Sequence, residues 1–395
     1  MQVYSNSALS AEIVDWPVHM RQALALARTV ITAAPNPRVG CVIVKDRKLV
    51  GEGWHAAAGQ AHAEVAALRQ AGAAARAATA FVTLEPCAHT GRTGPCVEAL
   101  LAAGIERVVL ASIDPNPSVS GKGITVLEAA GVQVYHLKDF EQDAMDLNRG
   151  YFRRHQQGLP YVRLKLAMSL DGRTALANGD SKWITGPAAR ADGQLLRAHS
   201  CAIVTGIGTV LADDPALTVR SAELPLSQSA LQANALALSR QPLRVILDSG
   251  RRTPATARIL REQGSVVIFG TSSNTTDSSA YPGNVTLKAL PGAGSGLALR
   301  SVLESLAADF ECNEILVEAG AILSTAFIEA GLVDELLLYI APKLLGKDGR
   351  ALVEFTGLQT LADSIEFDII DVAIVGEAGH GDIRVTLQPR TAAGA

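Results

Sequence analysis

His62-Ala63-Glu64 is followed along the chain by Pro86-Cys87 and then by Cys96. These segments contain one histidine, two cysteines and a carboxylate, Glu64, that is not needed as a metal ligand. A zinc ion with three protein ligands keeps a fourth position for water, and this distinguishes a catalytic zinc site from a closed structural one. We therefore predict that His62, Cys87 and Cys96 bind a catalytic Zn²⁺ and that Glu64 moves protons.

The local pattern around these residues predicts where they lie. Side chains two apart do not share a face in the middle of a helix, so His62 and Glu64 are expected at a helix entrance. Cys87 follows a proline, and if it begins a second helix, the positive end of the helix dipole favours its thiolate. The zinc ion would lower the pKa of its bound water enough to supply hydroxide near neutral pH.

The histidine-x-glutamate and proline-cysteine pattern is typical of zinc deaminases that act on nucleobases, in which hydroxide attacks the amino-bearing ring carbon. Most of that superfamily has two residues between the cysteines, whereas residues 88–95 separate Cys87 from Cys96 here. Judged by the generic spacing, Cys96 is either the third ligand or an incidental cysteine on a surface glycine turn. The long loop also predicts that His89, Thr90 and Arg92 line the pocket and meet an anionic substrate.

The composition bounds the class of protein. A chain of 395 residues exceeds one ordinary core and predicts two domains. A net charge of −4 and 4% aromatic residues argue against nucleic acid as the partner, so a small-molecule substrate is expected. Nothing at the N-terminus predicts export, and no stretch approaches eighteen uninterrupted apolar residues. We expect a cytoplasmic protein without membrane contact, and a homo-oligomer is compatible with the sequence.

The five cysteines are odd in number and sparse, which predicts no disulfide framework. Two of them are the ligand candidates described above. The other three, Cys41, Cys201 and Cys312, sit in apolar runs and are expected to be small core residues.

The first part of the chain predicts a three-layer α/β domain. A helix is expected over residues 18–33, and Pro35-Asn36-Pro37 then breaks it and holds Asn36 on a stiff loop, where we expect it to contact substrate together with His89. Five strands are expected, at residues 39–45, 49–55, 80–84, 107–112 and 132–136. After a helix around residues 140–154, Gly158-Leu159-Pro160 interrupts the pattern, so a boundary is expected near residues 146–160.

The second part predicts a mixed sheet with helices. The strand expected at residues 161–168 alternates, with Arg163 and Lys165 on the face opposite its apolar side chains. Further strands are expected at residues 201–205, 244–248, 265–270 and 314–318, and an antiparallel end of the sheet is expected at residues 334–342, 367–375 and 382–387. Residues 221–239 and 271–284 lack a firm pattern and are expected to be exposed insertions.

The second part has no strand followed by glycine-x-glycine-x-x-glycine, so the usual dinucleotide fingerprint is missing. Glu318-Ala319-Gly320-Ala321 joins an apolar strand to a helix, and free amides at a helix start attract phosphate. By itself this junction is explained equally well by binding or by packing. The run from Leu211 to Arg220, with its Asp213-Asp214-Pro215 element, suits a polar ligand, although helix termination explains that element equally well.

Several long strings occur in a characteristic order. In the first half they are Pro35-Asn36-Pro37 with Val39-Gly40-Cys41, His62-Ala63-Glu64, and Thr83-Leu84-Glu85-Pro86-Cys87 with the long loop to Cys96. In the second half they are Leu164-Lys165-Leu166 with Ser169-Leu170-Asp171-Gly172-Arg173, Trp183-Ile184-Thr185, residues 211–220, Val317-Glu318-Ala319-Gly320, and Ala341-Pro342-Lys343-Leu344-Leu345-Gly346. Over nearly its whole length the chain thus resembles the bifunctional deaminase/reductases of riboflavin biosynthesis, a family that shows the same long loop.

The resemblance implies a cytidine-deaminase-like domain at residues 1–147 and a dihydrofolate-reductase-like α/β domain with a mixed sheet at residues 148–395. It also implies two consecutive steps. Zinc-dependent hydrolytic deamination of 2,5-diamino-6-(5-phosphoribosylamino)pyrimidin-4(3H)-one is followed by NADPH-dependent reduction of its ribosyl side chain to ribityl.

Site residues of the second domain also follow from the resemblance. It implies that NADPH lies against Ala167, Trp183, Thr209, Asp213, Ser249 and Gly320. It implies that substrate contacts Ser181, Arg197, Leu217, Arg220 and Glu318. Arginines suit the substrate phosphate because their planar fork matches its oxygens. Lys165 and Asp171 are the candidates for an acid in the reduction.

Two other functions are compatible with parts of the pattern. A nucleic-acid base deaminase with an accessory domain shares the zinc chemistry, but its surface is expected to be basic and interleaved with aromatic residues. A non-catalytic, zinc-stabilised binding protein would make Glu64 a solvated helix residue that tolerates replacement by glutamine.

Overall fold

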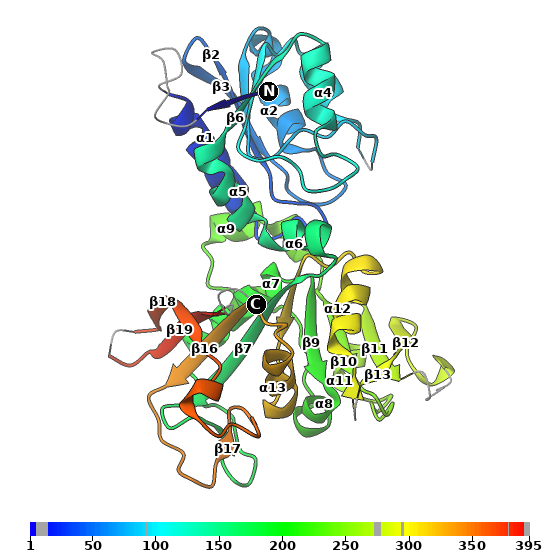
Figure 1. Cartoon of the computed structure of the whole chain (residues 1–395), viewed down its shortest axis with the longest axis vertical. Helices are drawn as coiled ribbons and strands as arrows, with labels where there is room; N and C mark the ends of the chain where they lie inside the picture. The colour runs from blue at the N-terminus through cyan, green and yellow to red at the C-terminus, as the bar shows by residue number, and fades with distance from the viewer. Residues whose placement is uncertain (5–14, 92, 272–277, 294–295, 378, 391–395) are drawn as a thin grey trace. The chain divides into compact units, whose positions relative to one another are not determined.

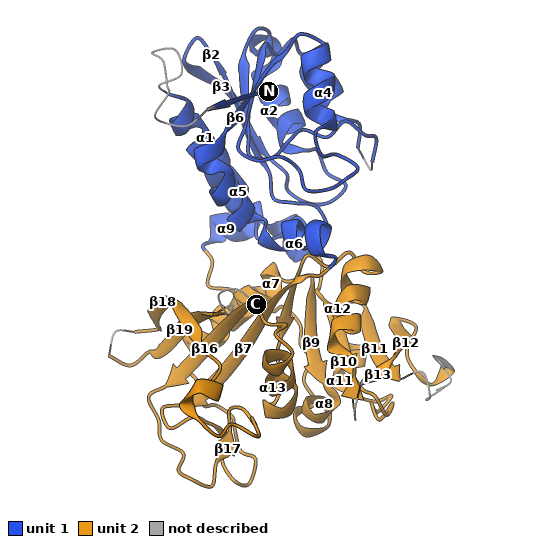
Figure 2. Ribbon diagram, viewed as in Figure 1, with its two compact units in different colours: residues 1–158, 227–239 blue, residues 159–226, 240–395 orange. Residues whose placement is uncertain are grey.

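The computed structural model describes residues 1–4, 15–91, 93–271, 278–293, 296–377 and 379–390. The chain divides into two compact units, which Figure 2 distinguishes by colour. Unit 1 comprises residues 1–158 and 227–239, and unit 2 comprises residues 159–226 and 240–395. Helix α6 (Arg149–Gln157) belongs to unit 1, where Tyr151 and Phe152 pack with Leu84.

Unit 1 is built on a six-stranded sheet with the order β1-β6-β5-β4-β2-β3 (Figure 1). The strands are β1 (Gln2–Tyr4), β2 (Gly40–Lys45), β3 (Lys48–Trp54), β4 (Thr79–Val82), β5 (Arg107–Leu110) and β6 (Gln133–Leu137). Strand β2 is antiparallel to β3 and β4, and the other neighbours are parallel. The five strands expected from the sequence are present, and β1 is an addition, because three residues are too short to show a period.

Helices cover both faces of this sheet. They are α1 (Trp16–Arg28), α2 (Ala63–Ala71), α3 (Cys96–Ala102), α4 (Lys122–Ala129) and α5 (Glu141–Leu147). Residues of α1 and α5 pack with Val42 and Phe81 in one cluster, and residues of α2, α3 and α4 pack with Ile43 and Val82 in another. The expected three layers are therefore confirmed, with successive side chains of the strands pointing to opposite faces.

Glycines allow α2 to lie unusually close to the sheet. A Cβ atom at Gly53 on β3 would lie 2.6 Å from the backbone nitrogen of Ala67, and one at Gly51 would lie 2.3 Å from the Ala67 oxygen. Neither distance is compatible with a side chain. The glycines of β3 therefore set the position of the helix that begins just after His62.

One segment expected to be an exposed insertion is in part a component of unit 1. Within residues 221–239, helices α9 (Gln228–Ala233) and α10 (Ala235–Leu238) flank Asn234, which is only 3% exposed. The Asn234 side chain accepts a hydrogen bond from the backbone nitrogen of Ile31 at 2.8 Å and donates to the oxygen of Thr29 at 2.9 Å. The expectation was wrong here because these partners lie about two hundred residues away in sequence.

Unit 2 contains a nine-stranded sheet with the order β12-β11-β10-β9-β15-β7-β16-β19-β18. The strands are β7 (Tyr161–Ser169), β9 (Ala202–Gly206), β10 (Leu243–Leu247), β11 (Val266–Thr271), β12 (Val285–Leu290), β15 (Glu314–Val317), β16 (Glu335–Ala341), β18 (Phe367–Val375) and β19 (Asp382–Pro389). The first seven strands in this order are parallel, and β19 and β18 continue the sheet antiparallel. The mixed sheet is confirmed, and β12 was not anticipated.

Smaller elements complete unit 2. Its helices include α7 (Pro187–His199), α8 (Ile207–Asp213), α11 (Arg258–Arg261), α12 (Leu299–Ala308) and α13 (Ala321–Glu329), and its short strand pairs are β8 (Arg173–Ala175) with β17 (Arg350–Ala351) and β13 (Gly292–Ala293) with β14 (Gly296–Leu297). The three cysteines expected to be core residues are buried, with Cys41 at 0%, Cys201 at 8% and Cys312 at 2% exposure.

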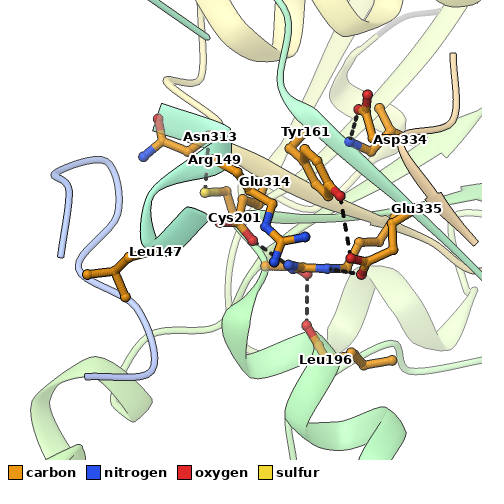
Figure 3. Close-up of polar contacts among 12 residues, drawn as sticks. Leu147, Arg149, Tyr161, Leu196, Cys201, Asn313, Glu314, Asp334 and Glu335 are labelled. Atoms are coloured by element: carbon orange, nitrogen blue, oxygen red, sulfur yellow. Dashed lines mark hydrogen bonds and ion pairs between the residues drawn. The ribbon is translucent and has the colours of Figure 1, made fainter. Parts of the chain in front are cut away.

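An ion-pair network joins three neighbouring strands of unit 2 near their amino ends (Figure 3). From β7, Arg163 donates to Glu335 on β16 at 2.7 Å and to Glu314 on β15 at 2.6 Å. Tyr161 adds a hydrogen bond to Glu335 at 3.4 Å. A buried charge needs such partners, because leaving one carboxylate or the guanidinium unpaired would be strongly destabilising.

Replacement of Asn234 by alanine is expected to destabilise unit 1. The hydrogen bonds from the Asn234 side chain to the Ile31 nitrogen and the Thr29 oxygen would be lost, and removing one side of a buried hydrogen bond costs about 1–3 kcal/mol. In a Trp183→Phe background, tryptophan fluorescence reports on unit 1 alone, so urea unfolding followed by this signal measures the change. The exposed Gln232→Ala serves as the matched control, and equal stability of the two variants would contradict a structural role for Asn234.

Candidate functional site

The entrance of α2 holds two of the predicted residues. His62 is the N-cap residue, with an extended ψ of 161°, and Glu64 lies in the first turn. Glu64 is 3% exposed, so its carboxyl group points into the protein rather than into solvent. The expectation of a helix entrance is confirmed.

The two cysteines are brought together by the start of α3. This helix begins at Cys96, whereas Cys87 lies in the loop after β4, so the condition considered for Cys87, that it opens a helix itself, is not met. The backbone nitrogen of Cys96 nevertheless faces the Cys87 sulfur at 3.4 Å. An amide at a helix start thus favours the Cys87 thiolate, as expected, but the helix is that of the other cysteine.

A buried carboxylate fixes the residue next to Cys87. Glu85 accepts hydrogen bonds from the backbone nitrogens of Gly121 and Gly123, each at 3.0 Å. At Gly123 a Cβ atom would lie 2.0 Å from the oxygen of Pro86, so only glycine permits this approach. The start of α4 therefore holds the Glu85-Pro86-Cys87 backbone in place.

The three predicted ligands form one cluster of donor atoms. The Nδ1 atom of His62 lies 3.2 Å from the sulfur of Cys96 and 3.5 Å from that of Cys87. All three donor atoms lie within 4.8 Å of one another. A tetrahedral zinc with ordinary bond lengths separates such nitrogen and sulfur donors by about 3.6 Å. The donor set and its spacing therefore fit zinc, and the doubt that generic spacing raised about Cys96 is not supported by the geometry.

The cluster also perturbs the ionisation of its members. Hydrogen bonds from Cys96 and then His62 hold the pKa of the Cys87 thiol well below its ordinary value, although burial opposes them. Burial, followed by the nearby charge of Cys87, raises the pKa of Glu64 to about 7. A carboxyl group with a pKa near neutrality can both accept and release a proton at physiological pH.

Residues that sequence reasoning missed orient the cluster. The Nε2 atom of His62 lies 3.2 Å from the Thr93 hydroxyl, so with Nδ1 facing the sulfurs its Nε2–H donates to Thr93. Such a partner fixes the tautomer of a ligating histidine. Thr93 lies in the long loop before Cys96, and its position there was the only signal available in the sequence.

Asn36 is held by a second histidine that the sequence did not single out. His55, which is 2% exposed, lies 3.1 Å from the Ala61 oxygen through Nδ1 and 3.0 Å from the Asn36 amide nitrogen through Nε2. Its ring centroid is 5.0 Å from that of His62. If His55 donates from Nδ1, it accepts from Asn36, which leaves the Asn36 carbonyl oxygen available to another group.

The other predicted contacts of the loop are less constrained. His89 and Thr90 are exposed, and neither belongs to the donor cluster. Arg92 lies outside the described residues. His89 is thus only two residues from Cys87 along the chain, but its side chain is not part of the donor cluster.

In unit 2 the predicted residues gather after the carboxyl ends of parallel strands. Ala167 is near the end of β7, Glu318 and Gly320 follow β15, Thr209 follows β9 within α8, and Ser249 follows β10. Because β10, β9, β15 and β7 are consecutive and parallel, these positions share one edge of the sheet. In open α/β sheets this edge is where ligands bind.

A charged group lies at the centre of this edge. Arg197 on α7 donates to the two oxygens of Glu318 at 2.6 and 2.9 Å. Burial opposes ionisation of Glu318, but the charge of Arg197 outweighs it and holds the pKa below its usual value. Lys165 lies close by, with its amine 5.5 Å from the ring centre of Tyr339, and burial lowers its pKa despite the charge of Glu318.

The loop that carries Ser181 and Trp183 is tied to the same edge. Lys343, which follows β16, donates to the oxygens of Trp183 and Ile184 at 2.9 and 2.7 Å. The Arg190 guanidinium carbon lies 4.6 Å from the centre of the Trp183 ring, and Trp183 is 63% exposed. The indole therefore presents an open face although its backbone is anchored.

Three other predicted residues differ in what they offer to a ligand. Leu217 is 5% exposed and packs in a core cluster with Ile203 and Ile246, so its side chain is not available for binding. Arg220 is exposed and pairs with Glu223 at 2.5 Å. Asp213 is exposed at the end of α8.

Asp171 has a different role from the one considered for it. Its carboxylate accepts hydrogen bonds from the backbone nitrogens of Leu345 at 3.0 Å and Gly346 at 2.7 Å. Together with the Ser169 hydroxyl, which contributes most, these bonds lower the pKa of Asp171 to about 2. A carboxyl group of that pKa is a poor proton donor, so Asp171 joins two loops instead.

Comparison with known proteins agrees with this arrangement. Residues 17–112 match the model of the cytidine and deoxycytidylate deaminase zinc-binding region, and residues 160–374 match that of the RibD C-terminal domain. The riboflavin biosynthesis protein RibD of Escherichia coli is 49% identical over 91% of this chain and 96% of its own length. The chain belongs to the RibD family. RibD of Haemophilus influenzae is 45% identical over 94% of the chain and 97% of its own length.

Solved structures of RibD proteins share the whole architecture. RibD of Acinetobacter baumannii matches with a TM-score of 0.84 and 45% identity, over 95% of this chain and 98% of that one. A diaminohydroxyphosphoribosylaminopyrimidine deaminase/5-amino-6-(5-phosphoribosylamino)uracil reductase of Thermotoga maritima matches with a TM-score of 0.78 and 30% identity, over 95% and 99% of the two chains. The expected fold class, a deaminase-like domain before a reductase domain, is confirmed.

Membership in the RibD family also decides between the functions left open by the sequence. The chain is a bifunctional deaminase/reductase of riboflavin biosynthesis, with the zinc and NADPH expected for the two domains of that family. A nucleic-acid base deaminase with an accessory domain is not favoured. Among the described residues, no helix has both the length and the apolar character needed to cross a membrane.

Replacement of Cys96 by serine is expected to abolish stable zinc binding. The variant keeps the shape of the side chain but removes one of two thiolates, and zinc prefers sulfur and nitrogen donors. Zinc content per chain, measured by mass spectrometry after gel filtration, tests this. Cys312→Ala removes a buried thiol outside the donor cluster and serves as the control, and full zinc retention by Cys96→Ser would remove Cys96 from the ligand set.

Proposed function

We propose that unit 1 deaminates 2,5-diamino-6-(5-phosphoribosylamino)pyrimidin-4(3H)-one, with His62, Cys87 and Cys96 as zinc ligands and Glu64 as the proton carrier. The observation that carries this proposal is the buried Glu64 carboxyl beside three donor atoms within 4.8 Å of one another. When bound, zinc supplies a water molecule of lowered pKa as the nucleophile. The pyrimidine product carries an oxygen where the amino group was, and ammonia leaves.

Glu64 has the properties that proton transfer requires. Its pKa, raised to about 7 by burial and then by the Cys87 charge, lets it take a proton during attack and return it to the departing amine. Asn36, held by His55 at 3.0 Å, offers a carbonyl oxygen with a set orientation. We assign Asn36 and, on the exposed loop, His89 to substrate binding.

Unit 2 reduces the deaminated product in this proposal, and NADPH supplies the hydride. The residues that would hold the coenzyme at the carboxyl-end edge of the parallel strands are Ala167, Trp183, Thr209, Asp213, Ser249 and Gly320. The amides at the start of α13, which follows Gly320, suit a phosphate group. The substrate contacts Ser181, Arg197, Leu217 through its backbone, Arg220 and Glu318.

Reduction of the ribosyl group needs a proton as well as a hydride. The hydride forms a new C–H bond at the sugar carbon bonded to nitrogen, the bond from that carbon to the ring oxygen breaks, and the ring oxygen takes a proton. Lys165 is the group best placed to hold that proton, because its amine is buried next to Glu318 and Arg197 and burial lowers its pKa from the ordinary lysine value. Asp171 is the weaker candidate for the proton donor, because its carboxylate already accepts hydrogen bonds from the Leu345 and Gly346 amides.

The cellular setting follows from the same chemistry. We propose a cytoplasmic enzyme, because all five cysteines are free thiols and two of them must stay reduced to bind zinc. A homo-oligomer is compatible with the proposal.

The two-step proposal is tested by a coupled assay. The aminated pyrimidine phosphate is supplied as sole substrate with NADPH, and ammonia release and NADPH oxidation are followed together, with and without a zinc chelator during purification. Ammonia release followed by NADPH oxidation, both abolished by zinc removal, supports the proposal. Ammonia without NADPH oxidation would contradict the reductase half, and neither signal would contradict both halves.

Glu64→Gln separates the two steps in that assay. Loss of the general acid-base group is expected to slow ammonia release by at least about 100-fold, while zinc content stays at the wild-type level. NADPH oxidation should fall with the aminated substrate and recover fully when the deaminated pyrimidine is supplied. Retention of deamination by Glu64→Gln would show that the proposed proton carrier is wrong.

Lys165→Met is expected to affect only the reductase. With the deaminated pyrimidine, the kcat of NADPH oxidation should fall about 100-fold because the proton source is lost, whereas ammonia release in unit 1 stays unchanged. Lys288→Met, which removes a partly exposed amine on β12 paired with Asp309, is the matched control. A reductase rate equal to that of the control would remove Lys165 from the mechanism.

A further inference from the structure

NADPH carries one phosphate more than NADH, on the 2′ oxygen of its adenosine ribose. Such a dianion is best recognised by a guanidinium group, whose donors match the phosphate oxygens. If unit 2 uses NADPH, as proposed above, a cation is expected near the adenosine end of the coenzyme. None of the coenzyme contacts considered so far is a cation.

The order of the strands indicates where that end lies. From β7, which carries Ala167, the sheet continues through β15, β9, β10 and β11. Neighbouring strands are about 4.8 Å apart, so β10 is roughly 15 Å from β7. A dinucleotide that begins near Ala167 and passes the start of α13 therefore reaches the carboxyl end of β10, where Ser249 lies.

The turn that follows β10 is held rigidly. The buried Asp248 carboxylate accepts hydrogen bonds from the backbone nitrogen and the hydroxyl of Thr253, each at 2.7 Å. At the end of β11, the Thr271 hydroxyl donates to the Ser249 oxygen at 3.1 Å. Residues 249–252 are thus presented on a fixed turn between two strand ends.

Two consecutive arginines on this turn have different surroundings. Arg251 donates to the backbone oxygens of Ile268 and Lys288 at 3.1 and 3.0 Å, so its guanidinium is committed to holding β11 and β12. Arg252 is exposed, and within the part of the chain that the structure describes its guanidinium has no hydrogen-bond or ion-pair partner.

Arg252 is also held next to the predicted coenzyme contact. A Cβ atom built on Gly250 would lie 3.6 Å from Cγ of Arg252 and 3.8 Å from both Cδ and Nε. The stem of the arginine side chain therefore lies over the backbone of Gly250, which adjoins Ser249, and the residue remains exposed. Its charge is uncompensated by described residues and lies at the carboxyl end of β10.

We propose that Arg252 binds the 2′-phosphate of NADPH and so determines the preference of the reductase for NADPH over NADH. Arg251 is less suited to this role, because its Nη1 and Nη2 atoms already donate to backbone oxygens of β11 and β12. Ser249 and the turn that Asp248 holds position the arginine for the phosphate. The assignment makes Arg252 a specificity-determining residue that leaves the hydride transfer itself untouched.

Binding of coenzyme fragments tests the proposal without the reaction. Isothermal calorimetry compares adenosine 2′,5′-bisphosphate with adenosine 5′-monophosphate on wild-type protein and on Arg252→Gln. Loss of a charge-assisted contact should weaken bisphosphate binding about 10- to 100-fold and leave the monophosphate unchanged. Arg252→Lys keeps the charge without the fork and should lie between the two.

Steady-state kinetics gives the matching readout with whole coenzymes. For Arg252→Gln the KM for NADPH should rise about 10- to 100-fold, with kcat and the KM for NADH unchanged. Arg300→Gln, which removes an exposed arginine of α12 paired with Glu304, should change none of these values. Ammonia release reports that unit 1 of the same preparations is folded, and unchanged binding of adenosine 5′-monophosphate reports that unit 2 is folded.

The outcomes distinguish this proposal from the function on which it rests. Equal weakening of both fragments, or an unchanged preference for the bisphosphate, would overturn the role of Arg252 while leaving an NADPH-dependent reductase in place. A wild-type protein that neither binds nor oxidises NADPH would overturn the proposed reductase and the role of Arg252 together.

Discussion

Parallel pairing of neighbouring strands is the constraint on which both candidate sites depend. Strands that run in one direction end at one edge of their sheet, so the loops after them meet although they are far apart in sequence. In unit 1, Cys87 follows β4, whose parallel neighbour is β5. In unit 2, β10, β9, β15 and β7 bring Ser249, Thr209, Glu318 and Ala167 to one edge.

Carboxylates that bind backbone amides then hold the loops at those edges. Glu85 accepts hydrogen bonds from the backbone amides of Gly121 and Gly123, and Asp171 accepts them from the amides of Leu345 and Gly346. Neither carboxylate is proposed to react. Each orders the backbone beside a reactive group, as hydrogen bonds to charged acceptors are stronger than those between neutral groups.

Much of the architecture was predictable from local patterns. Buried strands such as β2 and β11 are apolar except at their last residue, and β7 alternates so that Arg163 and Lys165 share a face. The elements that were not predicted correctly have no recognisable pattern in the neighbouring sequence. Strand β1 has only three residues, and the helices flanking Asn234 are stabilised by bonds to Ile31 and Thr29, which no window of the sequence contains.

Residue types alone determined the chemistry of this protein, because a histidine, two thiols and a separate carboxylate at those spacings suit a catalytic zinc, and because long strings of the second half match one family. Tertiary structure decided which atoms serve it. Contacts between distant segments turn Nδ1 of His62 toward the sulfurs and place the amide at the start of α3 beside Cys87. Similar contacts let Thr93 and His55 orient the site. Distances of this kind arise only when the backbone folds, since spacing along a chain does not specify direction in space.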